Sequence, residues 1–127
     1  MSETRYVLVV DDHEEVRQLF CDIIDLLGFT PRAVSSGVAA LQQLKANPFD
    51  LVILDMRMPD LNGLETFKAI RQFDSSVPVV LTTGFGMDKG VKEALSMGAL
   101  LCFEKPFNVA RAMNTIREII EKESPTR

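Results

Sequence analysis

Five short apolar runs divide the chain. They are rich in Val, Ile and Leu and show little polar alternation, which is typical of strands buried on both faces of a parallel sheet. The second run is the least apolar of the five. We expect strands at Tyr6–Val10, Thr30–Val34, Leu51–Leu54, Val77–Leu81 and Leu100–Phe103.

Helical spacing fills the segments between and after these runs. From Glu14 onward, apolar residues recur three and four positions apart as far as Leu27, and Gly28 is a good helix stop. The same periodicity predicts four further helices. They cover Ala39–Leu44, Leu64–Ile70, Val91–Met97 and Val109–Ile120.

The order strand then helix repeats five times, with short connections. This pattern predicts an α/β fold in which right-handed crossovers join parallel strands and helices cover both faces, giving three layers. The chain has 127 residues, which suits one domain. We therefore expect residues 1–127 to form a single domain with its core at about residues 5–122.

Composition and charge narrow the class of protein. Hydrophobic residues make up 46% and charged residues 25%, as in globular proteins, and the net charge of -4 argues against direct nucleic-acid binding. Cys21 and Cys102 lie in no cluster of potential metal ligands, so we expect reduced thiols. No apolar stretch suits a signal peptide or a membrane span. These features together predict a soluble cytoplasmic protein with no membrane contact.

Polar residues follow four of the five predicted strands, and in a parallel sheet those ends meet at one edge. They are Asp11 and Asp12, Asp55, Thr82 and Thr83, and Lys105. Open α/β sheets place their chemistry at this edge. Three carboxylates there would repel one another without a cation, and Mg2+ is the usual ion where phosphate is handled.

The other groups at this edge also suit phosphate chemistry. Lys105 offers a compact positive charge, Thr83 a hydroxyl, and an Asp carboxylate can act as a nucleophile that forms an aspartyl phosphate. Each residue also has a simpler explanation. Asp12 or Asp55 would be a helix cap or a solvated loop acid, Thr83 part of an ordinary turn, and Lys105 a surface charge. Their convergence on one edge favours the chemical interpretation.

Four segments carry a resemblance to a known family. Val7–Asp12, Leu54–Pro59 with Gly63, Pro78–Gly84 and Lys105–Phe107 resemble the receiver domains of two-component response regulators. The likeness covers nearly the whole chain from about Tyr6. It implies a flavodoxin-like, doubly wound sheet of strand order 2-1-3-4-5 with five helices.

The resemblance also implies roles for the acidic residues. Asp55 matches the phosphoryl acceptor at the end of the central strand. Asp11 and Asp12 match the acidic pair that holds Mg2+, together with Asp55 and the backbone carbonyl of Arg57. The implied cofactor is therefore Mg2+.

The remaining family positions are partly matched. Thr83 matches the switch hydroxyl, and Lys105 matches the lysine that contacts the phosphoryl group. Pro106 matches a proline usually preceded by a cis peptide bond. Two positions depart from the pattern: Cys102 stands where the family usually has an aromatic residue, and Phe85 stands where it often has a polar one.

The function that follows is a phosphorylation-controlled switch. Asp55 would accept a phosphoryl group from a sensor histidine kinase or a histidine phosphotransfer protein. The surface of the fourth helix, fifth strand and fifth helix would then signal to a downstream effector. The resemblance is compatible with a monomer or a phosphorylation-dependent dimer.

Three other functions fit the sequence less well. An aspartate-nucleophile phosphohydrolase typically has a second Asp two residues after the nucleophile, but the matching positions after Asp55 and Asp11 are Arg57 and His13. A flavin or nucleotide binder would need a loop rich in Gly, Ser or Thr after the first strand, and that loop, at 11–15, is acidic. A receiver used only for protein contacts would lack the acceptor or the lysine, whereas this chain has both Asp55 and Lys105.

Overall fold

Five parallel strands form the central sheet of this computed structural model, which describes residues 4–58, 62–84, 86 and 88–122. The strands are β1 (Tyr6–Val10), β2 (Thr30–Val34), β3 (Leu51–Asp55), β4 (Val79–Thr83) and β5 (Leu101–Glu104). They pair in the order β2-β1-β3-β4-β5. The predicted flavodoxin-like arrangement, with order 2-1-3-4-5, is confirmed.

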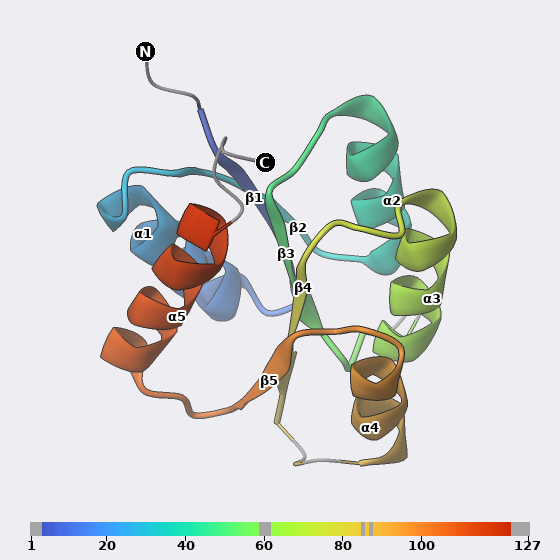
Figure 1. Ribbon diagram of the computed structural model, residues 1–127. Coiled ribbons are helices and arrows are strands. Elements are labelled where there is room, and N and C mark those ends of the chain that lie inside the picture. The colour runs from blue at the N-terminus through green and yellow to red at the C-terminus, as the bar shows by residue number, and fades with distance from the viewer. Residues whose placement is uncertain (1–3, 59–61, 85, 87, 123–127) are drawn as a thin grey trace.

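Helices cover the sheet on both faces. They are α1 (Glu14–Leu26), α2 (Gly37–Ala46), α3 (Gly63–Phe73), α4 (Lys89–Ser96) and α5 (Val109–Lys122). Figure 1 shows α1 and α5 on one side of the sheet and α2, α3 and α4 on the other. The three layers follow from the crossover connections, which place successive helices over one face or the other.

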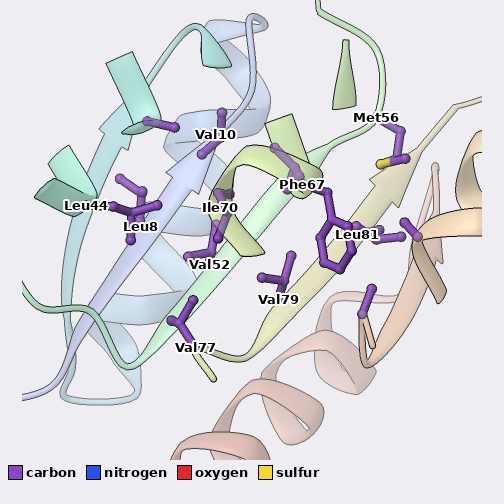
Figure 2. Packing of buried hydrophobic residues seen from close by; sticks show 14 of the residues in the cluster. Leu8, Val10, Leu44, Val52, Met56, Phe67, Ile70, Val77, Val79 and Leu81 are labelled. Atoms are coloured by element: carbon purple, nitrogen blue, oxygen red, sulfur yellow. The ribbon is translucent and has the colours of Figure 1, made fainter. Parts of the chain in front are cut away.

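Each face of the sheet has its own hydrophobic cluster, because successive residues of a strand point to opposite faces. In β3, Val52 and Leu54 belong to the cluster under α2, α3 and α4, whereas Leu51 and Ile53 belong to the cluster under α1 and α5. Figure 2 shows the first cluster, with Phe67 of α3 over the sheet. Every residue of β3 and β4 is buried, which explains the continuous apolar runs.

Three strands differ from their predicted bounds by one or two residues. β3 extends one residue further to include Asp55, and β4 begins at Val79 and continues to Thr83. Pro78 precedes β4 because it has no N–H to donate to a ladder, although its carbonyl accepts from Val52. β5 runs one residue later than predicted, to Glu104. The predicted turn residues Pro59–Leu61 lie outside the described part of the chain.

Candidate phosphoacceptor site

The carboxyl ends of the three inner strands bring polar residues into one row. In the register, Val10 lies beside Leu54, so that Asp11 follows β1 next to Asp55 at the end of β3. Asp55 in turn pairs with Thr82 of β4. The residues predicted from strand ends therefore do converge on one edge of the sheet.

Asp55 is almost wholly buried, with 1% of its surface exposed. Its Oδ1 accepts the backbone N–H of Arg57 at 3.3 Å, and the ammonium of Lys105 lies 3.6 Å from the same oxygen. Oδ2 is buried and has no hydrogen-bond partner among the described residues. Burial and the neighbouring charge of Asp11 raise the pKa of Asp55 to about 6, although Lys105 opposes the shift.

Lys105 bridges two of the strand ends. Its Nζ lies 3.0 Å from Oδ2 of Asp11, closer than its approach to Asp55. Its backbone N–H donates to the carbonyl of Thr83 at 2.8 Å, which ties the residue to β4. The peptide bond between Lys105 and Pro106 is cis, as the resemblance implied. The ammonium thus lies beside two carboxylates and is not a solvated surface charge.

The acidic residues are close enough to share one cation. Ligand atoms of Asp11, Asp12, His13 and Asp55 all lie within 4.8 Å of one another. Oxygen ligands about 2.1 Å from Mg2+ lie about 3 to 4.2 Å apart in an octahedral shell. The unpartnered Oδ2 of Asp55 supplies an oxygen with no competing hydrogen bond. The three carboxylates suit Mg2+, and its ligation by Asp11, Asp12, Asp55 and the carbonyl of Arg57 stays a prediction.

His13 also belongs to this cluster, although it was not among the candidate site residues of the sequence analysis. Its side chain is 64% exposed and it precedes the first turn of α1. However, Nδ1 lies 3.1 Å from both Asp11 Oδ1 and Asp12 Oδ1. The simpler explanation of Asp12 as the cap of α1 is wrong, because the N-cap is His13, whose side chain makes no cap hydrogen bond. The position of His13 directly after Asp11 and Asp12 in the sequence was the signal that could have predicted its place in this cluster.

Cys102 and Phe85 depart from the family pattern, and the described part of the chain includes only Cys102. Cys102 packs with the cluster under α2, α3 and α4, whereas Phe103 packs with the cluster under α1 and α5. These neighbours therefore face opposite sides of the sheet. Burial raises the pKa of the Cys102 thiol to about 11. Phe85 lies outside the described residues.

A close contact fixes the chain after Asp55. Gly63, the first residue of α3, donates its N–H to the carbonyl of Met56 at 3.2 Å. A Cβ atom at Gly63 would overlap the backbone of Met56. Met56 also donates to the carbonyl of Thr82 at 3.0 Å. The start of α3 and the end of β4 therefore both hold the residue next to Asp55.

A family model described as "Response regulator receiver domain" matches residues 7–117. The chain belongs to the response regulator receiver domain family. It is 39% identical over 116 residues to the transcriptional regulatory protein CpxR homolog of Haemophilus influenzae, covering 91% of the chain but 50% of that protein. The chain thus spans half the length of this relative, and 26% of another matched regulator, DctD of Rhizobium meliloti.

Other relatives are matched over nearly their full length. The sporulation initiation phosphotransferase F of Bacillus subtilis is 30% identical, with 94% of this chain and 93% of that protein covered. The solved structure of the Vibrio cholerae chemotaxis protein CheY4 is 27% identical with a TM-score of 0.84, covering 92% of this chain and 99% of that one. Among the described residues, no helix combines the length and apolar character that a membrane span requires.

Proposed function

We propose that this receiver domain is a switch controlled by phosphorylation of Asp55. The observation that carries the proposal is the buried Oδ2 of Asp55, which has no partner in the described structure although Lys105 and an acid pair surround it. A buried polar atom without a partner needs an explanation. The explanation we propose is that this oxygen is left free to bind a cation and to react with an incoming phosphoryl group. Membership of the receiver family supports this explanation.

In the proposed reaction, a carboxylate oxygen of Asp55 attacks the phosphorus of a phosphohistidine in line. The new O–P bond forms as the P–N bond breaks, and the electron pair stays on the imidazole nitrogen, which takes up a proton. Hydrolysis reverses the change at Asp55: water adds to phosphorus and the O–P electron pair returns to the carboxylate. Such chemistry depends mainly on positioning and electrostatics.

The surrounding residues provide that positioning. The Arg57 N–H holds Oδ1 of Asp55, and Lys105 lies where it can neutralise charge on the transferred group. Asp11, Asp12 and Asp55, with the Arg57 carbonyl, would hold Mg2+. When bound, Mg2+ supplies positive charge for the phosphoryl oxygens.

The proposed output is a change at the surface formed by α4, β5 and α5, with Thr83 as the switch hydroxyl. Thr83 is buried at the end of β4, next to the strand that carries Cys102. A cleft of about 510 Å³ between β5 and α5 gives a partner access to this region. Phosphorylation adds charge at Asp55, and this charge shifts the equilibrium between two conformers of the domain.

The proposed partners are a sensor histidine kinase or a histidine phosphotransfer protein as donor, and a downstream effector protein or domain as target. Support comes from relatives that include the sensor histidine kinase RcsC of Salmonella typhi, which is 32% identical over 126 residues. We place the chain in the cytoplasm, as a monomer or a phosphorylation-dependent dimer, without nucleic-acid contact. The net charge of -4 supports the absence of nucleic-acid contact.

The test is incubation with Mg2+ and acetyl phosphate, followed by intact-mass measurement. The wild type should gain one phosphoryl group that hydroxylamine removes, and Asp55→Asn should gain none. Asp74→Asn is the matched control, because Asp74 is a carboxylate outside the site, and it should be labelled as well as wild type. Equal labelling of Asp55→Asn would refute the assignment. Rapid turnover without an accumulated phosphoprotein would instead favour the phosphohydrolase alternative.

A further inference from the structure

The hydroxyl of Thr82 is not explained by the proposed phosphotransfer. Thr82 is 1% exposed, and its Oγ1 has no hydrogen-bond partner among the described residues. A buried hydroxyl that has lost water without gaining a partner destabilises a folded protein. A valine has the same shape without this penalty, so the hydroxyl at this position requires a reason.

The register shows what lies on either side of Thr82. Asp55 is its partner across β3 and β4, and Phe103 is its partner across β4 and β5. Neighbouring strands lie about 4.8 Å apart, so these are its nearest neighbours along the row. The ring of Phe103 lies 5.8 Å from that of Phe107 and offers no acceptor. Asp55 is therefore the polar neighbour of Thr82 in the row.

Thr82 and Asp55 also lie on the same face of the sheet. Val80 and Ile53, two residues before Thr82 and Asp55, both pack in the cluster under α1 and α5. Since side chains alternate along a strand, Thr82 and Asp55 share that face. Thr83, one residue further on, alternates to the other face. Of the two threonines, Thr82 is the one in the same row as Asp55.

Two unsatisfied groups of opposite kind thus stand next to each other. The hydroxyl of Thr82 is a donor without an acceptor, and Oδ2 of Asp55 is an acceptor without a donor. They do not bond to each other in this unphosphorylated state. Phosphorylation of Asp55 adds three acceptor oxygens to the side chain beside Thr82.

We propose that the Thr82 hydroxyl binds phosphorylated Asp55 by donating a hydrogen bond to its acyl phosphate. The donor has already lost its water on folding, so the new bond incurs no further desolvation of the hydroxyl. The bond forms only in the phosphorylated state. Thr82 therefore stabilises that state at the expense of the unphosphorylated fold.

This inference rests on the phosphoacceptor role of Asp55, and the test keeps the two apart. Beryllofluoride, formed from beryllium and fluoride in the presence of Mg2+, is the probe, because it mimics a phosphoryl group on an aspartate. Binding is measured by 19F NMR for the wild type, Thr82→Val, Thr82→Ser and Asp55→Asn. Thermal unfolding of the same four proteins is measured without beryllofluoride or Mg2+.

Thr82→Val should unfold a few degrees higher than wild type, because it removes the unsatisfied hydroxyl, yet bind beryllofluoride about 5- to 10-fold more weakly. Thr82→Ser keeps the donor and should bind within about twofold of wild type. A purely structural role would not produce this combination of higher stability and weaker binding.

The inference is overturned if Thr82→Val binds as tightly as wild type, or if Thr82→Ser weakens binding as much as Thr82→Val. Unchanged or lower stability of Thr82→Val would also overturn it, since the hydroxyl would then be satisfied already. If the wild type itself binds no beryllofluoride, or Asp55→Asn binds it equally, the proposed function fails first.

Discussion

Asp55 and Asp74 are the same residue type in opposite circumstances. Asp74 ends α3, and its Oδ1 accepts the N–H and hydroxyl of Ser76 at 2.8 and 3.0 Å and the N–H of Val77 at 3.1 Å. These hydrogen bonds, led by the Ser76 N–H, lower its pKa. Asp55 is more deeply buried, has an unpartnered oxygen, and has its pKa raised to about 6.

The difference separates a structural carboxylate, Asp74, from the carboxylate of Asp55, which we propose is the reactive one. At Asp74 the charged form is matched by local donors, so ionisation favours the fold. At Asp55, burial and the repulsion of Asp11 oppose ionisation, and Lys105 compensates only in part. The turn after α3 is satisfied as it stands, whereas Oδ2 of Asp55 at the edge of the sheet has no partner among the described residues. In the proposed function, an added cation or phosphoryl group fills this place.

The largest expected effect within this comparison concerns Lys105. Lys105→Met removes the ammonium beside Asp11 and Asp55, so phosphorylation by acetyl phosphate should slow about 100-fold, as for loss of one preorganised charge-stabilising group. The rate of phosphoprotein formation at saturating Mg2+ measures the effect. Lys68→Met is the control, because Lys68 pairs with Glu93 away from the site. Equal rates for Lys105→Met and wild type would show that the lysine takes no part.

Stability should change in opposite directions at the two aspartates. At pH 7, Asp74→Ala should lose about 1–2 kcal/mol because three donors lose their acceptor. Asp55→Asn should gain about 1 kcal/mol because a buried, opposed charge is removed. Urea unfolding in Mg2+-free buffer measures both changes. A loss of stability in Asp55→Asn would mean that the ionised carboxylate is well compensated, contrary to the comparison.

The pH dependence should distinguish the same pair. The folded pKa of Asp55 is raised from 3.8 to about 6, so the folded state holds its proton longer than the unfolded state. The wild type should therefore lose stability relative to Asp55→Asn as pH rises from about 4 to about 6. Asp74 has a lowered pKa, so its contribution is present above about 3.8 and is lost as pH falls further.

Unfolding of wild type, Asp55→Asn and Asp74→Asn between pH 3 and pH 7 tests these slopes. Parallel curves for wild type and Asp55→Asn between about pH 4 and pH 6 would remove the support for a raised pKa at Asp55.

The smallest effect expected is that of Mg2+ alone. Mg2+ at about three times its dissociation constant should stabilise the wild type by about 0.8 kcal/mol, because it binds the folded acid cluster only. Asp55→Asn should show a reduced gain, and Asp74→Asn the full gain. Thermal unfolding with and without Mg2+ gives the comparison. The cation site would be misplaced if Asp55→Asn gained as much as wild type.

Much of this arrangement was predictable because apolar runs and strand ends are local signals. Asp55 and Lys105 follow apolar runs that are typical of strands in a parallel sheet, and the carboxyl ends of such strands lie at one edge of the sheet. The contact of His13 with both acids was not predictable, because it depends on how the loop before α1 turns. The place of Thr82 depends on register, and a shift of one residue would have put Thr83 in its row.

The most direct test of the account is to trap the phosphoryl group where it forms. Borohydride reduces an aspartyl phosphate to homoserine, so peptide mass spectrometry after treatment with acetyl phosphate, Mg2+ and borohydride identifies the modified residue. The account predicts homoserine at position 55 and an unmodified acid at positions 11, 12 and 74. Homoserine at position 11 or 12 would contradict it, as would phosphorylation that leaves position 55 intact.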